Sequence, residues 1–219
     1  MTILHDESKR QVIEQRILHI LNTAEDFLSP RTINSPRSVG DAVERVIADN
    51  LETIIGRDVC RNYSTSFARR AMADIAFEDI HGRYYVVDVK THRVSTKFNM
   101  PNLTSVDRLS RFYEEDNNVF ALLHVDYEID GSRVVVSGVH FVPIELLDWG
   151  CLTIGALGWG QIQISNANNI VVKESTRKAW MIQLCDELLE FYPKEISKIG
   201  DRIARFEEVK RFWLAKPDG

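Results

Sequence analysis

The sequence predicts an α/β fold in which a mixed β-sheet is covered by helices. Apolar residues recur at helical spacing near both ends of the chain, whereas strand-like runs and turn sequences fill the middle. Helices that flank a strand-rich centre are typical of a sheet with covered faces. No internal repeat or low-complexity tract interrupts this order. We therefore expect a single domain over residues 1–219.

The N-terminal part is predicted to be helical. Residues 9–28 carry apolar side chains at helical spacing, and the proline-containing stretch that follows is predicted to be a linker. Residues 1–37 thus form an N-terminal helix and linker, which is a candidate dimerisation element. Ser38 is expected to cap a second helix, with Asp41 three residues further on, and this helix is expected to run to about Ile55.

The middle of the chain is predicted to contain five strands and one helix. Two hairpins are expected, because apolar runs flank the turn sequences IHGR and DGSR, and Asp-Gly is favoured in a type I′ turn. The run QIQIS alternates as a short strand does. The predicted strands are residues 72–79, 84–91, 119–128, 133–142 and 161–165, and the predicted helix is 103–114.

The C-terminal part is predicted to form two helices separated by Pro193. The first is expected to begin at Ser175 or Thr176. The second carries an apolar row, which we interpret as core or as a dimer contact: Ile196, Ile199, Ile203 and Phe206.

The composition is ordinary for a soluble protein, with 44% hydrophobic and 27% charged residues. No apolar run reaches the roughly 18 residues of a membrane span, and the N-terminus lacks a signal-peptide pattern, so a cytoplasmic protein without a membrane partner is expected. Net charge is −5, but residues 61–97 contain seven basic and four acidic residues. A local basic region is typical of polyanion binding, and scattered solvated charge is the alternative.

The feature that carries chemistry is a pair of charged residues in an apolar strand. In YYVVDVKTHR, Asp88 and Lys90 are two residues apart, so a pleated strand places both side chains on one face. If the preceding apolar run pairs with this one, Asp74 comes beside Asp88. Adjacent carboxylates repel each other, and a hard cation such as Mg²⁺ removes that repulsion. The Val89 carbonyl can add a ligand, and Lys90 can orient or help deprotonate a nucleophile.

The spacing of these residues is a loose pattern, and a surface ion pair between Asp88 and Lys90 is the alternative. Two observations favour a site. Asp74 and Asp88 both lie in apolar strands, where an unpaired charge is costly. A third carboxylate, Glu44, lies in an apolar row of the second predicted helix, where it is either at the margin of the core or directed at a cation.

An acid on an early helix, followed by Asp74 and then Asp88-Val89-Lys90, resembles the PD-(D/E)xK nuclease superfamily. The stretch ADIAFEDIHGRYYVVDVKTHRVSTKFNMPNLTS, with WGQIQIS and STRKAW downstream, is similar to the blunt-cutting type II restriction endonucleases of the HincII and EcoRV kind. The similarity covers residues 39–105 and, in patches, 155–180. One position departs from the pattern, because Ala73 stands where the superfamily's name has proline.

The resemblance implies a Mg²⁺-dependent homodimer that hydrolyses phosphodiester bonds at a short site in double-stranded DNA, alongside a cognate DNA methyltransferase. It implies that Asp74, Asp88 and Lys90 are catalytic, that Glu44 is an auxiliary acid, and that Asp74, Asp88 and the Val89 carbonyl bind Mg²⁺. The residues implied to contact DNA are Thr91, Arg93, Ser95, Lys97, Asn99, Asn102, Gln161 and Gln163. Another nuclease of the superfamily, acting in repair or on junctions, and a non-catalytic DNA-binding protein remain alternatives.

Overall fold

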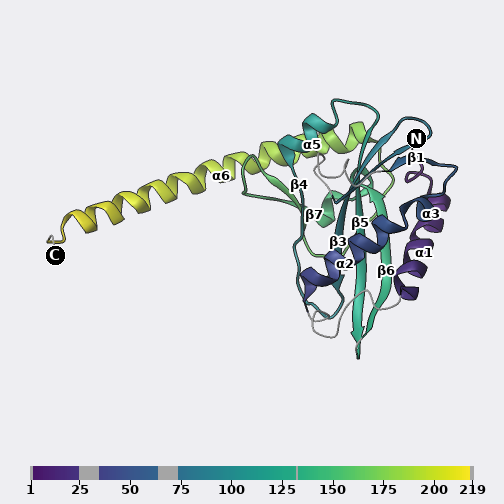
Figure 1. Ribbon diagram of the computed structural model, residues 1–219. Coiled ribbons are helices and arrows are strands. Elements are labelled where there is room, and N and C mark those ends of the chain that lie inside the picture. The colour runs from purple at the N-terminus through teal and green to yellow at the C-terminus, as the bar shows by residue number, and fades with distance from the viewer. Residues whose placement is uncertain (1, 25–34, 64–73, 132, 218–219) are drawn as a thin grey trace. The chain divides into compact units, whose positions relative to one another are not determined.

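A computed structural model describes residues 2–24, 35–63, 74–131 and 133–217 (Figure 1). By its internal contacts the chain divides into two compact units, Met1–Thr176 and Arg177–Gly219. The first unit contains a five-stranded sheet, a three-stranded sheet and several helices, and the second is a single long helix. The predicted α/β fold with a mixed sheet is confirmed. That residues 1–219 act as one domain stays a prediction.

The main sheet has the strand order β1-β2-β3-β5-β6. Strand β3 pairs antiparallel with β2 and parallel with β5, and the other neighbours are antiparallel, so the sheet is mixed. The parallel pairing runs along all of β3, from Tyr84 opposite Asn118 to Arg93 opposite Tyr127. The strands are β1 (Cys60–Tyr63), β2 (Ile75–Asp79), β3 (Tyr84–Arg93), β5 (Asn118–Asp130) and β6 (Arg133–Pro143).

Both predicted hairpins are confirmed. Gly82 lies in the β2–β3 turn with φ 73°, and Gly131 lies in the β5–β6 turn with φ 58°. Both angles are in the left-handed region, which glycine enters without a steric penalty. The turn at Gly82 fixes the β2–β3 register, in which Ile75 pairs with Val87 and Asp74 lies at the level of Asp88.

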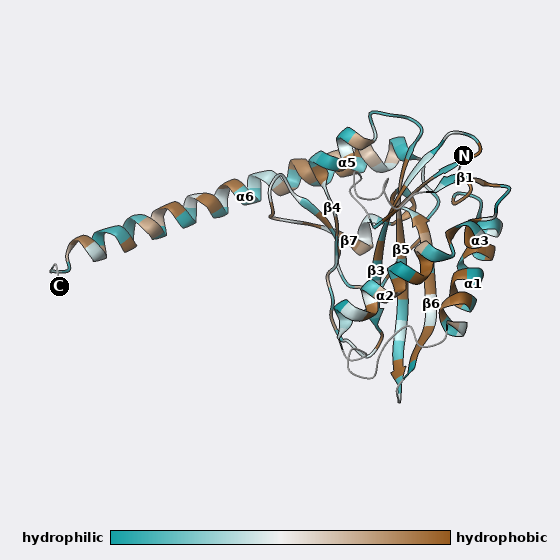
Figure 2. Ribbon diagram, viewed as in Figure 1, coloured by the Kyte–Doolittle hydropathy of each residue, from teal (hydrophilic) through white to brown (hydrophobic). Residues whose placement is uncertain are grey.

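Helices α1 (Glu7–Thr23), α2 (Pro36–Asp49) and α3 (Leu51–Ile55) contribute to one core with the main sheet. Helix α1 packs against β6 and α2 packs against β3 (Figure 1). Ile13, Ile17 and Leu21 form the buried row of α1, and Figure 2 shows apolar residues on the helices beside this sheet. The three helices therefore cover one face of the main sheet.

The predicted start and end of the second helix are wrong. The cap is Ser35, whose side chain accepts a hydrogen bond from the Ser38 backbone, and Pro36 occupies the first turn, where no N–H is needed. The helix ends at Asp49, and a separate short helix, α3, follows Asn50. Residues 25–34, most of the predicted linker, lie outside the described residues.

The second sheet has the strand order β4-β8-β7, with β4 (Asn102–Ser105), β8 (Gln161–Ile164) and β7 (Leu152–Gly155). The predicted helix 103–114 is therefore wrong at its beginning, since Ser105 ends β4 and caps α5 (Val106–Phe112). The cause is the pairing of β4 with β8, a partner about 60 residues away in the chain that a local pattern does not contain.

The second unit is α6 (Arg177–Leu214), which runs without a break through Pro193 (Figure 1). The prediction of two helices separated by this proline is wrong. Proline removes one backbone hydrogen bond, at a cost of about 3 kcal/mol, but the carbonyl it frees belongs to Leu189, which is exposed to solvent. Among the described residues, no helix is both long enough and apolar enough to cross a membrane.

Candidate nuclease active site

Asp88 and Lys90 form an ion pair on one face of β3, as the strand periodicity predicts. Lys90 Nζ lies 2.7 Å from Asp88 Oδ1. The Asp88 side chain is only 8% exposed, and its other oxygen, Oδ2, is buried with no hydrogen-bond partner among the described residues. The pair is therefore not the surface ion pair of the alternative interpretation, because a buried carboxylate oxygen without a partner is costly.

Burial raises the pKa of Asp88 from 3.8 to about 7. Two neighbours act on it in opposite directions, since Lys90 lowers the pKa and Asp74 raises it. The pKa of Asp88 is raised overall, so the charge of Lys90 does not offset the combined effect of burial and of the neighbouring Asp74. Additional positive charge at this place would favour the ionised form of Asp88.

Asp74 lies directly before β2 and continues its pairing with β3. Its backbone N–H donates to the Val87 carbonyl at 3.1 Å, and its Oδ2 accepts from the Val89 N–H at 2.7 Å. In an extended strand the N–H and C=O of one residue point to the same side. The Val89 carbonyl consequently points to the same side of β3 as its N–H, which is the side on which Asp74 lies. The Asp88 side chain projects from the face of the sheet.

Glu44 reaches the same place from α2. Its pKa is raised, first by burial and then by the charges of Asp74 and Asp41, whereas Lys90 lowers it. The mutual influence places the Glu44 carboxyl within electrostatic range of both Asp74 and Lys90. The packing of α2 against β3 thus adds a third acid to the pair that the hairpin assembles.

One observation supports a divalent cation here: the buried Asp88 Oδ2 has no hydrogen-bond partner in the part of the chain that the structure describes. Its ordinary ligands would be Asp74, Asp88 and the main-chain oxygen of Val89, a donor set of hard oxygens that suits Mg²⁺. Within the described ranges, no group of three or more His, Cys, Asp or Glu side chains is arranged to hold a metal ion. The proposed ligands do not form such a group, because only Asp74 and Asp88 would bind through side chains and Val89 would bind through its main-chain carbonyl.

The candidate DNA-contacting residues in and after β3 lie on different surfaces. Thr91 lies on the opposite face of β3 from Lys90, close to α2: a β-carbon added at Gly40 would be 3.5 Å from its Oγ1. Ser95 and Lys97 are exposed, and Asn99 is partly buried. The Thr91 side chain therefore points away from the face of β3 that carries Asp88 and Lys90.

Of the five basic residues of 61–97 that the structure describes, three are in ion pairs, including Lys90, and two are not. Arg61 pairs with Glu78 and Arg83 with Asp79. By contrast, Arg93 and Lys97 have no ion-pair partner among the described residues. The Arg93 Nε is also buried without a hydrogen-bond partner there. Arg69 and Arg70 lie outside the described residues. Arg93 ends β3 and Lys97 follows it, so both lie beyond Asp88 and Lys90 along the chain.

Asn168 is a positioning residue that the sequence analysis missed. Its Oδ1 is 3.0 Å from His92 Nε2, and its Nδ2 donates to the Thr96 carbonyl at 3.0 Å. Nearby, the Ala167 N–H donates to the Asn99 carbonyl at 2.8 Å. The segment that leaves β3 is thus held by a loop more than 60 residues further along the chain. No local sequence signal announces such a contact.

Gln161 and Gln163 lie on one face of β8, while Ile162 and Ile164 are buried on the other, as predicted. The Gln163 amide donates to Asn102 Oδ1, its pairing neighbour on β4. The Gln163 amide therefore donates to a side chain and not to a backbone group. The structure joins the candidate residues into two groups: the carboxylates with Lys90, and the Asn102–Gln163 amide pair.

A row of histidines extends the Lys90 face of the sheet, and the sequence analysis did not find it. His124 lies opposite Lys90 in the β3–β5 register, and its ring centroid is 6.0 Å from that of His92 and 6.3 Å from that of His140. His124 is fully buried with no hydrogen bond to either ring nitrogen among the described residues. Burial lowers its pKa to about 3, so its ring is neutral at ordinary pH.

No protein-family model matches the chain, and no curated protein matches it. The geometry alone therefore defines the candidate site. Two neighbouring acids and a lysine lie on a hairpin of a mixed sheet, and a further acid lies on a helix that packs against that sheet.

Proposed function

We propose that this chain is a Mg²⁺-dependent endonuclease of the PD-(D/E)xK type that cuts double-stranded DNA at a short specific site, as type II restriction enzymes do. The single observation that carries the proposal is the Asp88–Lys90 pair, in which the buried Asp88 Oδ2 has no hydrogen-bond partner among the described residues and Asp74 accepts from the Val89 N–H. A structural ion pair has no need of the second acid or of the unpartnered oxygen.

The residues have distinct roles in this proposal. Asp74, Asp88 and the Val89 carbonyl would hold Mg²⁺, which when bound supplies positive charge at the scissile phosphate and a water of lowered pKa. Lys90, held by Asp88 Oδ1, orients the attacking water beside the phosphate. Glu44, whose pKa is raised by burial and by the neighbouring acids, is the auxiliary acid beside Asp74 and Lys90.

The proposed substrate is duplex DNA, bound by two copies of the chain. Arg93 and Lys97 supply unpaired positive charge for the phosphate backbone, which positions a protein on DNA without reading its sequence. Gln161, Gln163 and Asn102 supply amides, which pair with the N6 and N7 edge of adenine in the major groove. A homodimer matches the twofold symmetry of a palindromic site and places one active site on each strand. A methyltransferase that protects the same site in the host is the partner expected of such an enzyme.

A plasmid-cleavage assay with Mg²⁺ and with EDTA tests the proposal. Wild-type protein is expected to give discrete fragments with Mg²⁺ and none with EDTA. Lys90→Ala is expected to abolish cleavage and keep DNA binding, because binding uses distant phosphate contacts. Lys9→Ala, which removes an exposed lysine far from β3, is the matched control and should cut normally.

Three other outcomes separate the alternatives. Cleavage by Lys90→Ala within about tenfold of wild type excludes its assigned role. Smearing, or cutting only of branched or damaged DNA, indicates a repair or junction-resolving nuclease of the same superfamily. Binding of DNA without any cleavage indicates a non-catalytic DNA-binding protein, for which the buried carboxylates need another explanation.

A further inference from the structure

Helix α6 carries an apolar stripe that alternates steps of three and four residues along most of its length. This spacing is the heptad repeat of a coiled coil, because it keeps one face of a helix in line over many turns. The positions of the stripe are Ile182, Cys185, Leu189, Tyr192, Ile196, Ile199, Ile203, Phe206, Lys210 and Trp213. Only Lys210 breaks the apolar pattern. We call these ten positions the α6 stripe.

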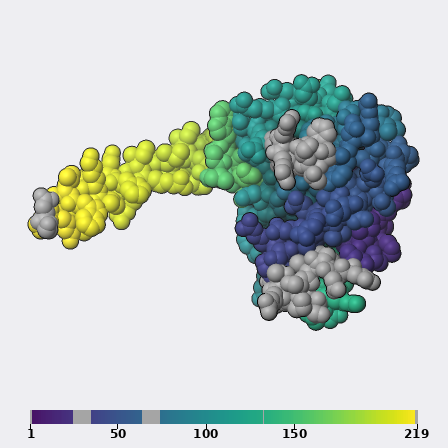
Figure 3. Space-filling view, in the orientation of Figure 1, coloured from purple at the N-terminus to yellow at the C-terminus, as the bar shows by residue number. Residues whose placement is uncertain are grey.

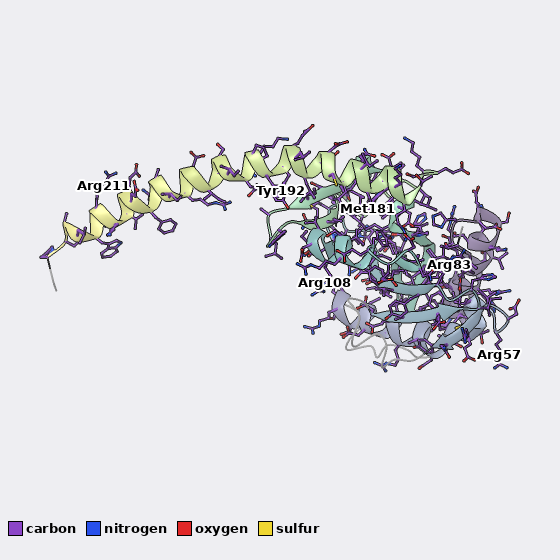
Figure 4. All side chains as sticks on the ribbon, turned by 90° about the horizontal axis from the view of Figure 1, so that it is seen from above. Arg57, Arg83, Arg108, Met181, Tyr192 and Arg211 are labelled. Atoms are coloured by element: carbon purple, nitrogen blue, oxygen red, sulfur yellow. The ribbon has the colours of Figure 1, made fainter. Side chains whose placement is uncertain are left out.

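The α6 stripe is exposed to solvent in this chain. Leu189, Ile196 and Phe206 are each 70% exposed or more, and Ile199 and Ile203 are about half exposed. An open groove of about 420 Å³ follows the stripe between Ile199 and Lys210. Figure 2 shows apolar residues recurring among polar ones along the helix, and Figure 4 shows its side chains, with Tyr192 of the stripe labelled. A continuous apolar surface of this kind on a soluble chain indicates a binding surface.

The charges beside the stripe indicate what covers it. On the outer face of α6, neighbouring charges pair within the helix, as Glu190 does with Lys194 and Arg205 with Glu208. Arg202 and Glu207 border the stripe on opposite sides, at heptad positions g and e, and neither has an ion-pair partner among the described residues. In a parallel two-stranded coiled coil, position g of one helix meets position e of the next heptad of the other. Arg202 of one copy then faces Glu207 of the second copy, twice per dimer.

We propose that the α6 stripe is a homodimer interface, in which α6 of a second copy of this chain packs in parallel to form a two-stranded coiled coil. The a positions 182, 196 and 203 are isoleucine, which parallel two-stranded coiled coils favour there, but none of the d positions is leucine, so the number of strands rests on Lys210 and on the Arg202–Glu207 pair. Lys210 is also an a position, so the two copies bring like charges together there. A polar residue at one a position fixes the register and the number of strands at a cost in affinity.

Sedimentation equilibrium of the full chain, without DNA or Mg²⁺, tests the interface. The proposal expects a particle of twice the chain mass of 25.2 kDa at about 10 µM. Ile199→Glu and Ile203→Glu each place charge in the apolar interface and should raise the dissociation constant by about 100-fold or more. Ala204→Glu introduces the same charge on the outer face of α6 and is the matched control, which should leave the constant within about threefold.

Charge variants test the parallel register. Arg202→Glu sets two acids against each other and should weaken the dimer by about tenfold, and adding Glu207→Arg should restore it. Lys210→Ile removes the like-charge contact and should strengthen the dimer by about tenfold.

Three results would overturn the proposal. A wild-type chain that stays monomeric up to about 100 µM has no such interface. A dimer that resists both isoleucine variants uses another surface. A dimer that Arg202→Glu weakens, but that adding Glu207→Arg does not restore, is not parallel in this register. Because none of these measurements involves cleavage, their outcome is independent of the nuclease assay.

Discussion

Replacing Asp88 by asparagine should stabilise the protein at alkaline pH while removing its response to Mg²⁺. The folded state raises the pKa of Asp88 from 3.8 to about 7, so the fold retains a proton that the unfolded chain has already released. Between these two pKa values the unfolded state binds fewer protons, and stability therefore falls as pH rises. At one pKa unit per 1.36 kcal/mol, ionised Asp88 costs about 4 kcal/mol above pH 7.

The pH dependence isolates this cost from the other effects of the substitution. Asparagine does not titrate, whereas from pH 5 to pH 8 wild type loses about 2.5 kcal/mol through Asp88. Urea unfolding in EDTA at both pH values measures it, and the stability difference, Asp88→Asn minus wild type, should grow by that amount. The shift corresponds to about 1 M urea at the midpoint. Asp201→Asn, at an exposed position of α6, is the control and should follow wild type.

The same unfolding experiment with Mg²⁺ tests the metal site. At 10 mM Mg²⁺, a site with a dissociation constant of ~1 mM stabilises wild type by about 1.4 kcal/mol. Asp88→Asn removes a hard anionic ligand and should lose this stabilisation. The reasoning is refuted if the two proteins show parallel pH profiles in EDTA, or if Mg²⁺ stabilises the variant as much as wild type.

Three further predictions address the rest of the site. Asp74→Asn keeps an oxygen for the Val89 N–H but loses a charge, so cleavage at ordinary Mg²⁺ should disappear, and full activity in the plasmid assay would exclude Asp74 as a ligand. Lys97→Ala should weaken binding to cognate and scrambled duplexes equally and lower the slope of log affinity against log salt concentration by about one. Gln161→Ala should instead lower the ratio of cognate to scrambled affinity, and the reverse pattern would exchange the roles of the two residues. The pKa of His124 is lowered to about 3, so protonation of the unfolded chain should cost wild type about 3 kcal/mol between pH 7 and pH 4, a loss absent in His124→Leu. Identical acid unfolding profiles for the two proteins would contradict this.

The position of α2 explains how the site obtains a third acid. Figure 3 shows the helix as a band at the surface of the face in view, and its contacts with β3 bring Glu44 within electrostatic range of Asp74. An acidic residue on an apolar helical row is compatible with several positions when only the sequence is known. The packing of that helix on one strand selects among them.

Features that depend on neighbours in the chain can be predicted from the sequence alone. The two hairpins follow from turn glycines between apolar runs, and the shared face of Asp88 and Lys90 follows from the two-residue period of a strand. The pairing of β2 with β3 then sets Asp74 beside Asp88, because a tight turn leaves little freedom of register. These elements required only local geometry, and the candidate active site is built from them.

Tertiary structure decided what depends on partners that are distant in the chain. Strand β4 replaces the beginning of a predicted helix because it pairs with β8, and Asn168 holds the segment after β3 through contacts across more than 70 residues. The burial that raises the Asp88 pKa and leaves Oδ2 without a partner is likewise a property of the packed sheet. Pro193 was predicted to end a helix, yet α6 continues through it, since the carbonyl it frees belongs to an exposed residue. A local preference of about 3 kcal/mol is small enough for the surroundings to override, which is why only the fold reveals one unbroken heptad stripe.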